Sequence, residues 1–381
     1  MTPLPSLLRK SSSTDWRSFT AAVVLSLLGL VTMTSFAGDD PFAVRQAIWI
    51  FLGVLLFFVT SSIDWRVLRR GSVAGIIFMI AVVPLIFLVV AGQAIQGARS
   101  WFDIGPFALQ PVEFVKLALI IALAKYFSRR HIEIANIRHI LISGGYALLV
   151  FVLVALQPDF GSALIIGFIW LGMVLVSGIS RVHLIALFLI GLVAIGGLWT
   201  FGFKEYQRER LLTFLHPMAD IQGAGYNAYQ STVAVGSGEI IGKGIGYGTQ
   251  SKLRFLPEYQ TDFIFAAFAE EWGLVGVLLI FSLYGLIFVQ ILRTATRGAS
   301  NFETLFALGV LFYFLAHFTL HVGINMGLLP VTGTTIPFMS YGGSHILAEF
   351  IALGMISGMS RYARVTHPEA LTNEFSGAHG R

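Results

Sequence analysis

The sequence has no cysteine and few charged residues. Among its 381 residues there is no Cys, and only 12% are Asp, Glu, Lys or Arg, about half the share found in soluble globular proteins. The lack of cysteine excludes disulfides, thiolate metal sites and cysteine nucleophiles. The shortage of charge leaves too little polar surface to face water on all sides. A soluble enzyme, a fibrous protein and a disordered chain are therefore excluded.

Apolar residues take the place of the missing charge. The hydrophobic share is 56%, with 33 Phe and 40 Gly, and glycine is more frequent in membrane helices than in soluble ones. The net charge of +5 fits Lys and Arg gathered beside membrane helices, so we expect no nucleic-acid binding. No tandem repeat or low-complexity linker is visible. We expect an all-α polytopic membrane protein whose residues 1–381 form a single membrane domain.

Ten segments are predicted to cross the membrane, because a crossing helix needs about 20 mostly apolar residues. A long outer loop of about 203–262 separates the seventh from the eighth, and short tails cover residues 1–17 and 361–381. The predicted spans are 18–38, 46–63, 71–98, 109–127, 140–158, 160–180, 182–203, 263–292, 304–324 and 341–360.

The distribution of Lys and Arg predicts the orientation. With the N-terminus inside, most of these residues fall on inner segments, whereas the short outer segments hold Arg45 and Arg99. Short loops decide orientation, since long loops cross largely regardless of their charge. Both termini are therefore predicted to be cytoplasmic. The first residues precede an apolar run without an A-x-A pattern, which favours a retained first helix over a cleaved signal peptide.

The outer loop contains a glycine-rich stretch at 236–248. It does not match a Walker A loop, because Gly244 follows Lys243 where Ser or Thr is needed and Ser237 replaces the first glycine. The Gly246-Tyr247-Gly248 triplet lacks the Thr-Val of a potassium filter. We expect a tight surface or re-entrant loop whose glycines allow left-handed turns.

Several polar residues fall in or beside the predicted spans, where charges are costly and often functional. Glu113 and Lys116 are three residues apart and share a helix face. They form either a structural ion pair or a cation, oriented by its acid, that holds a phosphate. Arg99 and Trp101 lie just upstream on the outer side, and a guanidinium with an aromatic ring suits a sugar phosphate.

Two aspartates stand at predicted outer helix starts. Asp159 suits a helix N-cap. Asp262 suits a cap as well, but Glu258, Lys252 and Arg254 lie near it in the sequence and suggest a mixed-charge cluster.

Two histidines and a glutamate fall within the last spans. His317 and His321 have the i, i+4 spacing of a metal pair, yet without a third ligand paired core histidines are favoured. Glu349 lies in the last span, and no partner for it is evident from the sequence.

Taken together, these stretches resemble the SEDS family of polytopic peptidoglycan glycosyltransferases. Within that family, residues 248–258 are similar to the rod-shape branch, RodA, rather than to the division branch, FtsW. The segments that carry the resemblance are 97–101, 110–116, 157–162, 256–265, 269–273, 329–333 and 337–344.

The resemblance implies roles for several residues. The usual acid of the Leu-Pro-Glu-x-x-Thr-Asp-Phe motif falls on Asp262, which we expect to be the catalytic base. Glu113 and Lys116 match the acid and lysine of the Gln-Pro-x-Glu-x-x-Lys motif. The expected substrate-binding set is Arg99, Trp101, Glu113, Lys116, Asp159, Glu258 and Ser344.

Three positions depart from the family pattern. Gln260 stands where His is usual, His345 where a second Ser is usual, and Glu349 where the residue is commonly neutral. None of these changes removes the expected catalytic acid, but each could alter how protons move in the site.

The resemblance also implies a reaction. Lipid II would be polymerised into β-1,4-linked glycan strands during cell elongation, with release of undecaprenyl pyrophosphate. The enzyme must supply a base for the sugar 4-hydroxyl and positive charge for the pyrophosphate. A divalent cation, Mg²⁺ or Mn²⁺, would assist, although the sequence shows no dedicated metal cage, and no organic cofactor is expected.

Partners and location follow from the same resemblance. The expected partner is a class B penicillin-binding protein, a single-span transpeptidase, in the bacterial cytoplasmic (inner) membrane. The alternatives are a lipid II flippase, for which no convincing inverted repeat is found, and a non-catalytic scaffold.

Overall fold

Among the residues that the structure describes, the regular elements are helices apart from one small hairpin. The computed structural model describes residues 15–36, 42–92, 100–104, 107–129, 137–197, 199–200, 208, 212–214, 225–253 and 255–363. The hairpin pairs β1 (Phe102–Ile104) with β2 (Phe107–Leu109) in antiparallel register. The all-α class predicted from the sequence is confirmed for the described residues.

Ten helices of 17 residues or more are described, and each predicted span falls on one of them. Six are long and apolar enough to cross a membrane, namely α1, α2, α3, α5, α11 and α12, while α6 and α7 are shorter and apolar. The ten are α1 (Trp16–Phe36), α2 (Phe42–Ser61), α3 (Val73–Ala91), α4 (Pro111–Ser128), α5 (Ile137–Leu156), α6 (Phe160–Val176), α7 (Arg181–Gly197), α11 (Ile264–Ala295), α12 (Asn301–Asn325) and α13 (Gly343–Ala363).

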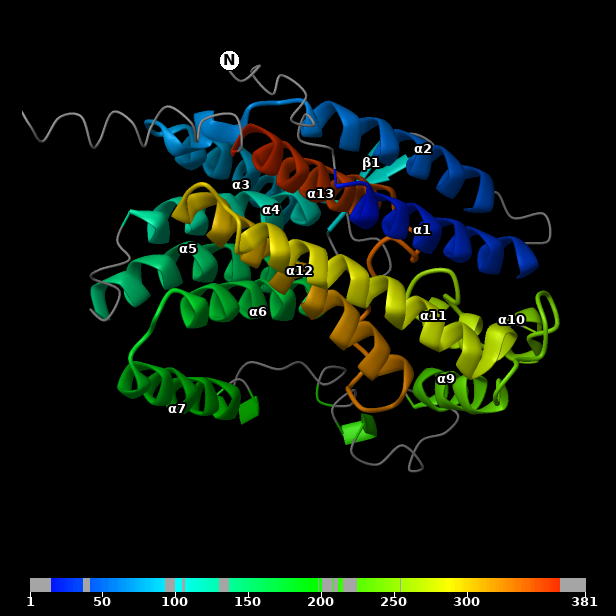
Figure 1. Cartoon of the computed structure of the whole chain (residues 1–381). Coiled ribbons are helices and arrows are strands. Elements are labelled where there is room, and N and C mark those ends of the chain that lie inside the picture. Colours follow the sequence, from blue (N-terminus) through cyan, green and yellow to red (C-terminus); the bar gives the residue numbers. More distant parts are fainter. Residues whose placement is uncertain are drawn as a thin grey trace, which may run out of the picture.

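Three shorter helices lie between the long ones. The 3₁₀ helix η1 (Trp65–Arg69) follows α2, and α9 (Tyr226–Ser237) and α10 (Thr249–Lys252) belong to the segment between α7 and α11. Helix α9 packs against α11, which places this part of the loop beside the bundle (Figure 1).

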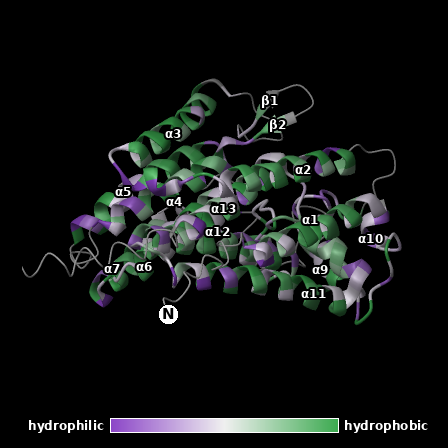
Figure 2. Cartoon of the chain, turned by 45° about the horizontal axis from the view of Figure 1, so that its top comes forward, coloured by the Kyte–Doolittle hydropathy of each residue, from purple (hydrophilic) through white to green (hydrophobic). Residues whose placement is uncertain are grey.

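The long helices run roughly alongside one another, with α4 and α12 innermost (Figure 1). Helix α12 packs on α4, α6 and α11, whereas α13 packs on α2 and α4. Helix α7 lies at the margin, below α6 in the same view. Most helices carry apolar residues along their length (Figure 2). Large apolar side chains such as Val90 and Val182 remain exposed, as expected for faces that contact lipid.

The glycine-rich loop docks on a break in α11. Gly273 has a φ of 62° inside this helix, and the loop pairs with the broken backbone: Lys243 donates its N–H to the Glu270 carbonyl, and Leu274 donates to Glu239. A Cβ on Gly242, whose φ is 78°, would lie 2.1 Å from the Glu271 carbonyl oxygen. The glycines thus permit close backbone packing, as the tight-loop interpretation predicted.

Candidate active site

A polar cavity of about 200 Å³ lies among the helix ends and loops of the bundle. Residues far apart in the sequence supply its walls, from the hairpin through to the start of α13. Six of the eight residues predicted to bind or transform the substrate line it: Trp101, Glu113, Asp159, Glu258, Asp262 and Ser344.

Asp262 lies in a tight turn just before α11. The Glu258 carbonyl accepts hydrogen bonds from the backbone N–H groups of Thr261, Asp262 and Phe263, and Glu258 itself has a φ of 53°. The Asn325 side chain donates to the Asp262 carbonyl at 2.9 Å. The N-cap of α11 is Phe263, so Asp262 is not the cap of this helix.

Glu113 lies in the first turn of α4, where Pro111 starts the helix. Its carboxylate accepts from the Lys116 ammonium at 2.7 Å and from the Tyr313 hydroxyl at 3.0 Å, and it contacts His345 Nδ1 at 3.0 Å. A buried carboxylate needs such donors to offset its lost hydration. The i, i+3 pair predicted from the sequence therefore forms, inside the protein.

Lys116 is completely buried and does not line the cavity. Its ammonium lies behind Glu113 and His317, both of which do. In this structure the side chains of Glu113 and His317 therefore separate the positive charge of Lys116 from the cavity. Direct contact between Lys116 and a phosphate stays a prediction.

The remaining lining residues are fixed by hydrogen bonds between helix starts. Asp159 is the N-cap of α6 and accepts from Ser162 N–H, as the cap interpretation predicted. It also accepts from the Gln110 side chain at 3.2 Å. The Ser344 hydroxyl accepts from the Gln110 backbone N–H at 2.8 Å. The start of α4 is thereby tied to the starts of α6 and α13.

Some predicted residues cannot be placed in this cavity. Arg99 and Arg254 lie outside the described residues. Lys252 is exposed, with its ammonium 5.8 Å from the centre of the Tyr247 ring, and does not line the cavity. Of the cluster suggested by the sequence, the structure therefore places Glu258 and Asp262 together at the cavity and Lys252 away from it.

His345 and His317 are members of the site that were not predicted from the sequence. Both line the cavity, and His317 also contacts Lys116 at 3.0 Å. His317 and His321 each contact a loop carbonyl, of Thr335 and Thr334, which agrees with core histidines. The departure at His345 was the one signal available, because a titratable ring in place of a hydroxyl changes the charge of a site.

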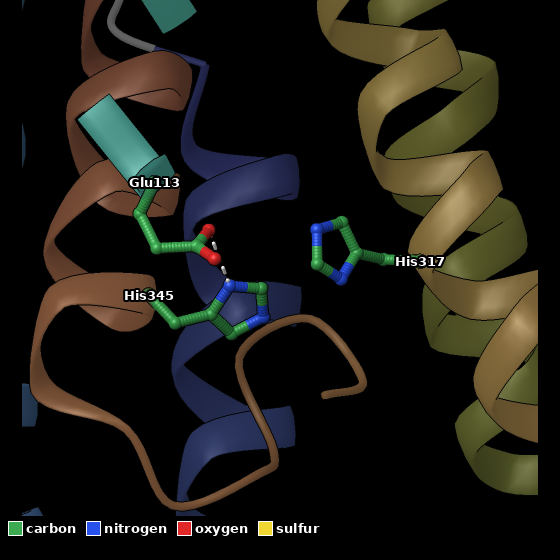
Figure 3. A group of neighbouring side chains, drawn as sticks. All are labelled: Glu113, His317 and His345. Carbon is green, nitrogen blue, oxygen red and sulfur yellow. Dashed lines mark hydrogen bonds and ion pairs between the residues drawn. The ribbon is translucent and has the colours of Figure 1, made fainter. Parts of the chain in front are cut away.

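Glu113, His317 and His345 point toward one another from α4, α12 and α13 (Figure 3), with potential ligand atoms within 4.8 Å. The geometry does not fit a divalent metal, because the Lys116 ammonium already contacts Glu113 and His317. A metal would face this cation at close range, so these three side chains do not suit a divalent metal.

The arrangement combines a carboxylate with nearby positive charge. The Asp262 carboxylate lines the cavity and belongs to the class of groups that act as general bases, while the Lys116 ammonium lies behind the cavity wall, 3.0 Å from His317. A low-dielectric surrounding strengthens the effect of such a charge on an anion. The cavity is therefore suited to a transfer in which a hydroxyl loses a proton and an anionic group departs.

Comparisons with known proteins agree with this chemistry. Residues 14–365 match the model of the cell cycle protein family that comprises FtsW, RodA and SpoVE. Stage V sporulation protein E of Bacillus subtilis is 32% identical over 93% of this chain and 99% of its own. The peptidoglycan glycosyltransferase MrdB of Escherichia coli is 33% identical over 90% of this chain and 93% of its own.

Solved structures show the same fold. A chain from a peptidoglycan synthase complex that coordinates polymerization and crosslinking superimposes with a TM-score of 0.79 and 32% identity, covering 92% of this chain and 98% of that one. The rod shape determining protein RodA of Thermus thermophilus gives 0.69 and 30%, covering 94% and 98%. The chain therefore belongs to the FtsW, RodA and SpoVE family of polytopic membrane proteins, the SEDS family.

Proposed function

We propose that this protein is a peptidoglycan glycosyltransferase that polymerises lipid II into β-1,4-linked glycan strands during cell elongation. The observation that carries the proposal is that Asp262 and Glu113 line the same cavity. Glu113 in turn binds the buried Lys116 ammonium. Relatives over nearly the whole chain bear the name peptidoglycan glycosyltransferase. The elongation role rests on the RodA-like segment at 248–258.

In the proposed reaction Asp262 accepts the proton of the acceptor sugar's 4-hydroxyl. The oxygen then attacks the anomeric carbon of the donor, and the bond from that carbon to the pyrophosphate oxygen breaks. Displacement from the opposite face inverts the anomeric centre and gives the β linkage. Undecaprenyl pyrophosphate leaves with the electron pair, so no nucleotide is needed.

Charge stabilisation would come from the opposite side of the cavity. The buried Lys116 ammonium, oriented by Glu113, would act across the cavity wall, whereas the His345 ring lines the cavity itself. Arg99 is proposed to bind the pyrophosphate and Trp101 the sugar, with Asp159, Glu258 and Ser344 completing the binding surface. A divalent cation, Mg²⁺ or Mn²⁺, that accompanies the pyrophosphate is proposed as part of the substrate complex and is assigned no protein ligands.

The proposed topology places this cavity at the outer surface. With ten spans and both termini cytoplasmic, the turn carrying Asp262 follows the outer loop, at the face where lipid II presents its sugars. The protein would lie in the bacterial cytoplasmic membrane, where lipid II is a substrate and the surrounding lipids contact the apolar helix faces.

The proposed partner is a class B penicillin-binding protein. Support comes from the structural neighbour, whose complex coordinates polymerization with crosslinking. We propose that the partner's single membrane helix packs on an apolar face of this bundle. Affinity purification from membranes in mild detergent should recover a transpeptidase, and repeated purification without one would count against this pairing.

Reconstitution distinguishes the proposed function from its main alternative. Purified protein in liposomes with labelled lipid II should produce glycan polymer, detected by gel electrophoresis and digestible with lysozyme. Lipid II that only changes leaflet, detected by accessibility to an external labelling reagent, would instead indicate a flippase. Absence of both products, with and without the transpeptidase, would favour a scaffold.

A further inference from the structure

Glu349 is a buried carboxylate that contacts two different parts of the site. It lies in α13 and is completely buried. Its Oε2 accepts the backbone N–H of Phe338 at 2.7 Å. Its Oε1 lies 2.8 Å from His345 Nε2, which is within ion-pair distance. The two groups are not oriented as in a hydrogen bond. Both oxygens are thus engaged, each in a different direction.

The first contact leads to Lys116. His345 is four residues before Glu349 on α13 and contacts it through Nε2, while its Nδ1 contacts Glu113 at 3.0 Å. The doubly protonated imidazolium suits this position, because its Nδ1–H can donate to Glu113 and its positive charge is attracted to a carboxylate at Glu349. Glu113 in turn holds Lys116 at 2.7 Å. The result is an alternating row of negative and positive groups.

The second contact leads to Asp262. Phe338 has a φ of 63°, a conformation that costs energy for a residue with a side chain, and its N–H donates to Glu349. The turn around Phe338 then contacts the segment before α11. The Ser340 hydroxyl donates to the Thr261 carbonyl at 2.9 Å, and Tyr341 N–H donates to the Gln260 carbonyl at 2.8 Å.

We infer that Glu349 is a positioning residue that sets the Asp262 turn and the Lys116 cation relative to each other. The Glu349 carboxylate does not line the cavity. It acts through His345 on one side and through the turn at Phe338 on the other. This inference rests on the proposed function, because glycan polymerisation is the activity through which the positioning is measured.

Substitutions at Glu349 separate the two contacts. Glu349→Gln removes the charge beside His345 but retains an oxygen for the Phe338 N–H. Glu349→Leu removes both, and His345→Gln removes only the contact that leads to Lys116. Glu303→Gln is the matched control. Glu303 is another buried carboxylate, located at the start of α12, and it pairs with Arg69. It is far from the site, because the 14 residues from Glu303 to His317 correspond to about 20 Å of helix.

The experiment measures kcat and KM for lipid II in liposomes at matched amounts of folded protein, judged by size-exclusion chromatography. We expect Glu349→Gln to lower kcat by roughly 10- to 100-fold while KM changes by less than about threefold, because the substrate still binds. Glu349→Leu should lose more, and Glu303→Gln should retain the wild-type kcat.

A double-substitution cycle tests whether Glu349 acts through His345. The Glu349→Gln/His345→Gln variant should lose about as much as the worse single variant, since one chain of contacts is broken twice. Losses that multiply would overturn the inference, as would wild-type kcat in folded Glu349→Gln. Wild-type protein that makes no polymer would instead refute the proposed function.

Glu349→Asp keeps the test decisive if Glu349→Gln does not fold. Asp retains the charge but is shorter by one methylene, so it cannot reach both Phe338 and His345. We expect folded protein with a reduced kcat and a KM near that of wild type. A wild-type kcat in this variant would equally overturn the inference.

Discussion

His317 and Lys116 meet inside the bundle in a way that fixes the tautomer of the histidine. The ring Nε2 lies 3.0 Å from Lys116 Nζ, and Nδ1 lies 3.0 Å from the Thr335 carbonyl oxygen. An ammonium only donates and a carbonyl only accepts. Nδ1 therefore carries the hydrogen, and Nε2 presents its lone pair to Lys116. His317 is a neutral acceptor that, with Glu113, orients the buried ammonium.

Replacing His317 by Phe should lower activity more than the same change at His321. Both rings contact a loop carbonyl through Nδ1, so each variant should lose roughly 1–3 kcal/mol of stability from an unsatisfied buried group. Only His317→Phe removes an acceptor from Lys116, and we expect a further loss of about tenfold in polymerisation rate, equivalent to about 1.4 kcal/mol. Thermal unfolding in detergent and the liposome assay measure the two effects; equal rates per folded protein in both variants would contradict this role.

Asp262→Asn should abolish most of the polymerisation. Asn keeps the size of the side chain but does not accept the proton, and a general base contributes about 10²–10⁴ in rate. Glycan synthesis is measured at matched membrane abundance, with Asp15→Asn as the control. Asp15 contacts Ser18 and Gln290 near the start of α1, and its variant should retain activity. Chain synthesis near the wild-type rate by Asp262→Asn would move the role to Glu258 or Asp159.

Lys116→Met and Glu113→Gln should each impair polymerisation, and their combination should separate folding from activity. Removing one member of a buried pair leaves the other charge uncompensated, at a typical cost of about 3–5 kcal/mol. The double variant has neither charge of the pair, so we expect it to recover much of that stability. It should remain inactive, because the cation is gone. Intact polymerisation by Lys116→Met would show that the pair is purely structural.

Gly242→Ala should weaken the docking of the glycine-rich loop. Both Gly242 and Gly244 have positive φ values, of 78° and 96°, but only at Gly242 would a Cβ clash, 2.1 Å from a backbone oxygen. At Gly244 the nearest atom is 3.4 Å away on the Tyr247 side chain. Backbone strain of about 1–3 kcal/mol applies to each alanine, so the difference in unfolding temperature between the two variants measures the clash. Equal unfolding temperatures would refute the close packing.

The sequence predicted the helices well because an uncharged run of about 20 residues has few alternatives in lipid. The residues at which the helices begin and end were predicted less well. The predicted span 71–98 continues beyond the described end of α3 at Ala91, where Gly92 is extended. Apolar composition alone does not mark where a helix stops, since a short loop can be equally apolar.

The site was predictable where its residues are near in sequence. Spacing alone paired Glu113 with Lys116 and suggested the cap at Asp159. Contacts between distant segments were not predictable in this way. The contact of His345 with Glu113 joins residues 232 positions apart, and it depends on how α13 packs beside α4. Glu349 therefore had no evident partner until the fold brought its partners together.

The position of α13 at the end of the sequence has a consequence for biosynthesis. This helix supplies Ser344 and His345 to the cavity, and it packs against α2, which precedes it by more than 280 residues in the chain. Gln46 on α2 donates to the Ser340 carbonyl just before α13 begins. A ribosome must therefore synthesise the chain through α13 before the cavity can close. Nascent chains that already span the membrane lack the site and remain inactive until the last helix inserts.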